Sequence, residues 1–262
     1  MTSLETRRLL RRLCFTICLN LGLALTACVT QPAIPIEDRL GALQEAAGQA
    51  LSLGDLNSME TIVLQIMQLD PDNALAVESM GMLALRQNRL LIARDYLTLT
   101  TELDPGRWSA WNGLGIVADR EEQHDEAQRH FLRGLALRPG HPQILANLGW
   151  SLLLDGRYEE AEMQLRASLQ TAPEVATSRS NLALAIAMQG RYDEAQEHYL
   201  SLYSEAVTAN NLGIAAQRRG DTNRAREFFQ QAISLSPTFY TRAASNLQQL
   251  QRSNPTPVLV LP

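Results

Sequence analysis

The chain lacks lysine: all 23 basic residues among its 262 residues are arginines. Phosphate-binding loops of the lysine type and catalysis through a lysine Schiff base are therefore excluded. Its four histidines, His124, His130, His141 and His198, show no spacing typical of a metal site. The sequence predicts no metal, no cofactor and no catalytic set, and hence a non-enzymatic protein. An enzyme stays the alternative class.

Cysteine and basic charge are scarce in the body of the chain. Cys14 and Cys18 fall in an expected leader, which leaves Cys28 alone and excludes an internal disulfide. Beyond residue 27 the chain carries 19 arginines against 27 acidic residues, a net charge of about −8. An acidic body without a basic stripe argues against nucleic acid as a partner and against recruitment by anionic lipid.

The first 28 residues have the layout of an export signal. Arginines at positions 7, 8, 11 and 12 precede an apolar run over residues 13–25, which is too short to span a bilayer comfortably. The run ends in Leu25-Thr26-Ala27-Cys28, and small residues before a cysteine resemble the lipobox of bacterial lipoproteins. An uncleaved signal anchor and twin-arginine export remain the alternatives.

The lipobox resemblance implies a membrane anchor made of lipid. In that family the chain is cleaved before the cysteine and the cysteine is acylated, here Cys28. A residue other than aspartate after the cysteine, here Val29, implies the outer membrane with the body facing the periplasm. Several acyl chains together hold a protein firmly, whereas one alone binds only marginally.

Most of the chain follows one period. Small residues recur at Gly81, Gly115, Gly149, Ala183 and Gly213, with separations of 34, 34, 34 and 30 residues. An alanine follows each of them twelve residues later, and a proline closes most units. A fixed period of this length indicates helical hairpins that bury their apolar faces only by stacking.

The residues at these positions resemble the tetratricopeptide repeat. Leu148-Gly149 lies in a first helix, Gly156-Arg157-Tyr158 forms the turn, and Ala161 with Leu165 shares one stripe of a second helix. The resemblance implies an all-α, right-handed solenoid of helical hairpins, with about six repeats and a C-terminal capping helix. The expected segments are a signal peptide (1–27), a tether (28–39), the solenoid (40–252) and a flexible tail (253–262).

The fifth repeat, residues 176–205, is four residues short and lacks its closing proline. Four residues are about one helical turn, so the apolar stripe stays nearly in phase. We expect a shortened second helix around residues 193–203.

The same resemblance implies a partner-binding groove on the inner, concave side of the first helices. Trp150 beside Leu153 and Leu184 is the strongest candidate anchor, because aromatic side chains dominate interface energetics. Packing of Trp150 between adjacent hairpins is the alternative. The groove residues carried over by position are Met82, Arg86, Asn112, Ile116, Arg120, Trp150, Leu153, Leu184, Asn210, Ile214 and Arg218.

A lipidated leader with about six repeats is similar to the pilus-assembly lipoproteins, and among them to the TadD family of the tight-adherence (Flp) pilus. The likeness lies in residues 179–185, 209–221 and 236–247. It implies an adaptor or pilotin that binds the secretin or other pilus and secretion components. A repeat lipoprotein of another envelope machine, such as a type IV pilus or peptidoglycan synthesis, is the alternative.

Overall fold

A computed structural model of the chain describes residues 35–235 and 240–253. Within these ranges the structure has thirteen helices and no strand. No helix among them combines the length and the apolar character needed to cross a bilayer. The predicted signal peptide, residues 28–34 of the tether and residues 254–262 of the tail lie outside the described residues.

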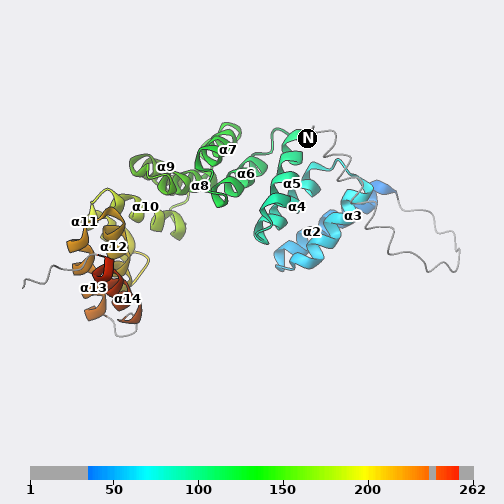
Figure 1. Cartoon of the computed structure of the whole chain (residues 1–262). Coiled ribbons are helices and arrows are strands. Elements are labelled where there is room, and N and C mark those ends of the chain that lie inside the picture. Colours follow the sequence, from blue (N-terminus) through cyan, green and yellow to red (C-terminus); the bar gives the residue numbers. More distant parts are fainter. Residues whose placement is uncertain (1–34, 236–239, 254–262) are drawn as a thin grey trace, which may run out of the picture. The chain divides into compact units, whose positions relative to one another are not determined.

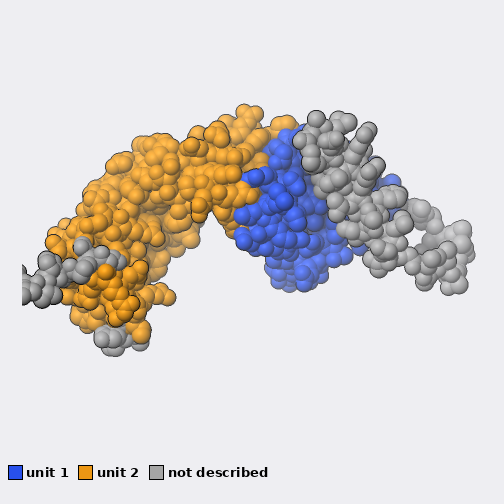
Figure 2. Space-filling model, in the orientation of Figure 1, with its two compact units in different colours: residues 1–104 blue, residues 105–262 orange. Residues whose placement is uncertain are grey.

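The chain divides into two compact units, residues 1–104 and residues 105–262 (Figure 2). The described part of unit 1 is two helical hairpins, in which each helix packs against the next. Its helices are α2 (Ile36–Ser52), α3 (Leu56–Leu69), α4 (Ala74–Arg86) and α5 (Leu90–Leu103).

Unit 2 is a stack of four hairpins closed by a single helix (Figure 1). The first helices of successive hairpins contact one another, as α6 does α8 and α10 does α12. The helices are α6 (Trp108–Arg120), α7 (His124–Leu137), α8 (Pro142–Leu154), α9 (Tyr158–Thr171), α10 (Ala176–Met188), α11 (Tyr192–Leu200), α12 (Glu205–Arg219), α13 (Thr222–Leu235) and α14 (Tyr240–Ser253). The predicted all-α fold of stacked hairpins is confirmed.

Four of the hairpins close where a glycine of the first helix meets a large residue of the second. A Cβ atom added to Gly115 would lie 2.4 Å from Cε1 of Phe131, and one added to Gly149 would lie 2.6 Å from Cγ of Leu165. Gly81 and Gly213 stand in the same relation to Leu97 and Phe229, at 2.7 and 2.5 Å. The alanines of the second column, at positions 93, 127, 161, 195 and 225, are all fully buried.

Several turns between the helices of a hairpin need a left-handed residue. Gly156 and Gly190 have φ of 78° and 86°, which glycine adopts without strain. Asn88 and Glu122 take the same conformation in the equivalent turns, with φ of 57° and 61°. The turn geometry that the sequence predicted from glycine is thus kept in two repeats without it.

Two predicted boundaries differ from the structure. Helix α2 begins at Ile36, so residues 36–39 of the predicted tether are helical. The amide of Arg39 donates to the carbonyl of Pro35, and acids at the start of the helix suit its positive end. Helix α11 is short, as predicted, but ends at Leu200, and a turn over residues 201–203 follows, in which Tyr203 N donates to Tyr199 O at 2.8 Å.

The close approach at Gly115 predicts that replacing this glycine by alanine destabilises the protein, although the same substitution usually stabilises a helix. Alanine favours a helix over glycine by about 1 kcal/mol, but the added Cβ would collide with the Phe131 ring, and overpacking costs about 1–3 kcal/mol. We expect Gly115→Ala to lower the free energy of unfolding by up to about 2 kcal/mol, measured by urea denaturation followed by circular dichroism.

Gly48 provides the matched control. It lies inside α2, is exposed, and has open space where a Cβ would be placed. Gly48→Ala should leave stability unchanged or raise it by up to about 1 kcal/mol. Equal effects of the two substitutions would contradict the packing described for Gly115.

Candidate partner-binding site

The predicted groove residues of unit 2 lie on its first helices. One of them follows the small residue of each repeat directly: Ile116, Trp150, Leu184 and Ile214. Trp150 is 38% exposed and the other three are half-buried. We call these four residues, together with Arg120, Leu154 and Arg218, the first-helix strip.

The polar end of the first-helix strip lies at the C-terminal ends of the helices. Arg120 in the last turn of α6 and Arg218 in that of α12 are exposed. Leu154 lies one turn beyond Trp150 on α8 and is 45% exposed, so the two share one face. The strip therefore offers exposed apolar surface in the middle and cationic groups on either side. Met82 and Arg86 hold the equivalent positions in α4 of unit 1, half-buried and exposed respectively.

Three of the predicted groove residues are buried, which corrects their assignment. Leu153 is 8% exposed, and Asn112 and Asn210 are 2% exposed. Asn147 Nδ2 donates to Asn112 Oδ1 at 2.8 Å, and Asn246 Nδ2 donates to Asn210 Oδ1 at 3.0 Å. Asn112 is held by α8, the first helix of the next repeat, and Asn210 by the closing helix α14, so both are buried between neighbouring helices and closed to a partner.

A second polar contact fixes α8 next to Trp150. Ser151 is buried, and its Oγ donates to Oδ1 of Asp119 on α6 at 2.7 Å. His124 Nδ1 lies 3.0 Å from the same oxygen. Burial raises the pKa of Asp119 above its ordinary value, although both hydrogen bonds oppose the rise. The contact holds α6 and α8 in register beside the first-helix strip.

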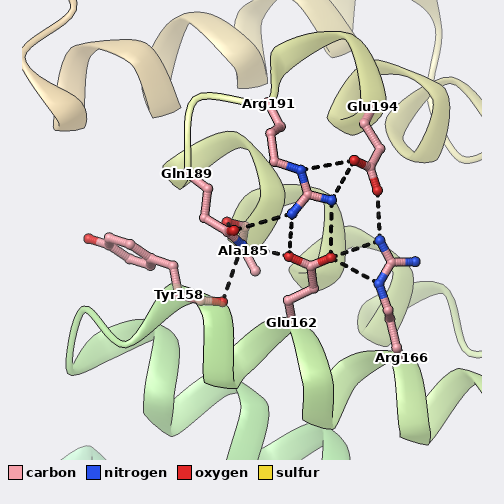
Figure 3. Close-up of polar contacts among 7 residues, drawn as sticks. All are labelled: Tyr158, Glu162, Arg166, Ala185, Gln189, Arg191 and Glu194. Atoms are coloured by element: carbon pink, nitrogen blue, oxygen red, sulfur yellow. Dashed lines mark hydrogen bonds and ion pairs between the residues drawn. The ribbon is translucent and has the colours of Figure 1, made fainter.

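A network of charged residues, missed by the sequence analysis, joins the second helices α9 and α11 (Figure 3). Glu162 of α9 is at its centre, with its side chain 12% exposed. Arg191, which precedes α11, lies 2.7 Å from it, and Arg166 lies 2.8 Å from it. Gln189 Nε2 donates to Glu162 at 2.7 Å, and Glu194 contacts Arg166 at 2.6 Å.

Hydrogen bonds from the neighbouring residues keep Glu162 ionised. Burial by itself would raise the pKa of Glu162, but the hydrogen bonds from Arg191, Gln189 and Arg166 outweigh it and lower the pKa to about 2. The carboxylate is therefore ionised throughout the physiological range, and the network braces one hairpin against the next.

The contact from arginine to the preceding second helix recurs along the chain. Arg157 Nη1 donates to Gln128 at 2.6 Å, 29 residues earlier, just as Arg191 reaches Glu162. In unit 1, Arg89 lies 3.4 Å from Glu60, again 29 residues earlier. Each acceptor directly follows the residue in the alanine column. The sequence signal for this contact is the arginine of the Gly-Arg-Tyr turn, which recurs at Arg157 and Arg191, whereas the glycine of the same turn indicates only where the helix ends.

The described residues 35–235 and 240–253 contain no group of three or more side chains placed to hold a metal ion. What the structure offers there is a repeated hairpin with a row of partly exposed side chains on its first helices. These features define a helical-repeat protein whose surface suits contact with another polypeptide.

Comparison with known families identifies the type of repeat. Three models of the tetratricopeptide repeat match residues 108–174, 156–210 and 206–239, which together cover residues 108–239 without a gap. The chain is a tetratricopeptide-repeat protein. No protein of curated function matches it significantly.

Several solved structures share the fold. PilF of Pseudomonas aeruginosa is 16% identical, with a TM-score of 0.63 over 84% of this chain and 99% of that protein. PilW, described as a widely conserved type IV pilus biogenesis factor, is 17% identical, with a TM-score of 0.63 over 80% of this chain and 97% of its own. YrrB, a repeat protein with an unusual peptide-binding site, is 20% identical, with a TM-score of 0.55 over 70% of this chain and 97% of its own.

The low pKa of Glu162 predicts a pH-dependent contribution to stability. An unfolded glutamate titrates near pH 4.3 and the folded one near 2, so its stabilisation is complete above about pH 5 and is lost as the pH falls toward 2. We expect Glu162→Gln to lower the free energy of unfolding at pH 7 by about 1–2 kcal/mol, since the exposed arginines weaken the pair. At pH 3 the difference should be smaller, measured by urea denaturation at both pH values.

The pair of Arg224 and Glu227 provides the control. Its charged atoms are 3.2 Å apart, but both side chains are about 60% exposed. Glu227→Gln should change stability by less than about 0.5 kcal/mol at either pH. An effect of Glu162→Gln that is the same at pH 7 and pH 3 would show that the ionised carboxylate is not what stabilises the fold.

Proposed function

We propose that this protein is a non-enzymatic scaffold that holds a segment of another protein on its first-helix strip. The exposure of Trp150 carries the proposal, because a large aromatic side chain on a surface is a frequent anchor of interfaces. Leu154 extends the apolar surface by one turn, and Arg120 and Arg218 place positive charge at its sides. A segment with apolar side chains flanked by acidic residues would match both features.

In this proposal the scaffold is anchored at the inner face of the outer membrane and faces the periplasm. The run Leu25-Thr26-Ala27-Cys28 supports it, because acylation of Cys28 would anchor the repeats through a short segment. A scaffold fixed in this way limits the search of its partner to the membrane surface, where its effective concentration is high.

The partner that we propose is the secretin or another channel component of the tight-adherence (Flp) pilus. The proposed mechanism is mechanical: the lipid fixes the scaffold, and the strip holds a helix or extended segment of a channel subunit during assembly. The resemblance of residues 179–185 and 209–221 to the TadD family supports this choice.

A type IV pilus is the second candidate machine. The observation that favours it is the shared fold with PilW, which is described as a type IV pilus biogenesis factor. Purification of the lipidated protein with its bound partners, followed by mass spectrometry, separates the two. Flp secretin subunits among the bound proteins would support the first candidate, and type IV pilus components the second.

Replacement of Trp150 by alanine tests the strip. Loss of an exposed aromatic anchor typically removes about 2 kcal/mol or more of binding energy. We therefore expect Trp150→Ala to bind the secretin at least about tenfold more weakly in a pull-down or titration. Helix content measured by circular dichroism should stay the same, because the side chain is partly exposed.

Met163 provides the matched control for Trp150. It is a large apolar residue, 59% exposed, but it lies on the second helix α9 outside the strip. Met163→Ala should leave secretin binding unchanged. Equal binding by Trp150→Ala and wild type would count against the strip as the partner site.

Replacement of Cys28 by serine tests the anchor. A serine has no thiol to accept the first lipid, so the full-length Cys28→Ser chain should incorporate no labelled palmitate and should leave the outer-membrane fraction. Cys18→Ser, in the leader, should behave like wild type. Palmitate retained at the wild-type level by the Cys28→Ser chain would show that Cys28 is not the lipidated residue.

A further inference from the structure

Tyr203 occupies the position at which other repeats of unit 2 carry a proline. It stands ten residues before the small residue of the repeat that follows, as Pro105, Pro139 and Pro173 do. Tyr203 comes directly after the short helix α11, in the turn that leads into α12. The fifth repeat therefore places a large aromatic side chain at a junction where the other repeats have only a small ring.

Three contacts hold Tyr203 in one orientation. Its backbone amide donates to the carbonyl of Tyr199, and its ring lies against the buried ring of Tyr199, with centroids 6.2 Å apart. Its hydroxyl donates to Oγ of Ser180 on α10 at 3.3 Å. The side chain is nevertheless 38% exposed, the same fraction as Trp150. A ring that is already fixed loses little conformational freedom when a partner binds to it.

The contact with Ser180 places Tyr203 beside the first-helix strip. Ser180 lies one turn before Leu184 of the strip, so the two side chains share a face of α10. Ser180 also corresponds to Asn112 of α6, since each stands three residues before the small residue of its repeat. The side chain of Asn112 meets the next first helix. Tyr203 therefore lies where α10 adjoins α12, at the N-terminal edge of the strip.

The two edges of the first-helix strip differ in chemistry. At the N-terminal edge, the exposed ring of Tyr203 lies two residues from Glu205, an exposed acid in the first turn of α12. At the C-terminal edge, the exposed residues Arg120 and Arg218 lie in the last turns of α6 and α12. Acidic groups of a bound segment are attracted to the arginines and repelled by Glu205. The strip therefore distinguishes the two sides of a segment that lies on it.

We propose that Tyr203 is a second aromatic anchor, beside Trp150, for the partner segment held on the first-helix strip. An apolar side chain of the segment packs on Tyr203 at the N-terminal edge, and its acidic side chains point toward Arg120 and Arg218 at the other. The partner is thus a segment whose apolar and acidic residues lie on opposite sides. This inference rests on the proposed function of the strip, and adds a residue and an orientation to it.

Photo-crosslinking in living cells tests the position of Tyr203. The aromatic cross-linker p-benzoylphenylalanine replaces residue 150, 203 or 200 of the full-length chain, and the adducts are sequenced by mass spectrometry. We expect residues 150 and 203 to label one polypeptide at sites within about fifteen residues of each other, the span of two helix spacings for an extended or a helical segment. Leu200, which is 42% exposed but lies on α11, is the control and should not label that segment.

The outcomes separate this inference from the proposed function. Labelling of a segment from residue 150 but not from residue 203 would overturn the role of Tyr203 and leave the strip in place. Labelling of unrelated polypeptides from the two positions would overturn it as well. Labelling from neither position would contradict the strip itself, and the second anchor with it.

A titration of the full-length chain in detergent micelles tests whether Tyr203 contacts the segment directly. The probe is the crosslinked segment made as a synthetic peptide. Tyr203→Ala should bind it about tenfold more weakly, as expected for loss of an aromatic anchor, whereas Tyr203→Phe keeps the ring and should bind within about threefold of wild type. Leu200→Ala should bind like wild type. Unchanged binding by Tyr203→Ala would overturn the proposal.

A double-mutant cycle excludes an indirect structural effect. The peptide residue that residue 203 labels is replaced by alanine and tested against wild type and Tyr203→Ala. Because the two groups touch, both changes together should weaken binding hardly more than either alone. Effects that multiply in full would show that Tyr203 acts only through the fold, and would overturn the anchor.

Charge substitutions test the orientation of the segment. Arg218→Glu should bind the peptide about tenfold more weakly, because its acidic residues then meet a carboxylate. Glu205→Gln should bind within about twofold of wild type, since the acidic residues lie at the opposite edge. A larger effect of Glu205→Gln than of Arg218→Glu would overturn the proposed orientation.

Discussion

The close contact between a glycine of the first helix and a large residue of the second is the constraint on which four of the repeats depend. The ring of Phe131 occupies the space that a side chain at position 115 would need, and Leu165 does the same at position 149. Interiors are packed too densely to absorb an extra methyl group without movement. This contact therefore fixes the distance between the two helices and also the rotation of the first helix about its own axis.

That rotation connects the packing to the proposed partner site. Successive residues of a helix are about 100° apart around its axis, so when Gly149 faces α9, the direction of Trp150 is determined. The same argument applies to Ile116, which follows Gly115. Because the first helices of unit 2 lie side by side, their residues at this position form one row. The contacts between Asn147 and Asn112 and between Ser151 and Asp119 then hold α6 and α8 together beneath that row.

The hairpins could be predicted from the sequence because they depend on contacts within one period. Gly115 and Ala127 stand at fixed spacings, and one residue type at each place is enough to identify them. Contacts between repeats were harder to predict, because they depend on pairs of residue types. Asn112 was assigned to the partner surface by its position in the repeat, as the resemblance to the tetratricopeptide repeat implied. Its burial follows only from the presence of Asn147 in the next repeat. The start of α2 at Ile36 was missed because the repeat pattern is weak there.

The fifth repeat, which is four residues short, shows how contacts within a hairpin and contacts between repeats respond to a deletion. Loss of four residues, about one turn, leaves the apolar stripe in phase, and Ala195 and Tyr199 of α11 remain buried. The contact of Arg191 with Glu162 also remains, because it lies at the start of α11, before the missing turn. Only the end of the helix is lost, and the hydroxyl of Thr208, although buried, forms no hydrogen bond with any residue that the structure describes. The fold thus tolerates the deletion because its essential contacts lie near the hairpin turn, whereas the opposite end of the hairpin can be shortened.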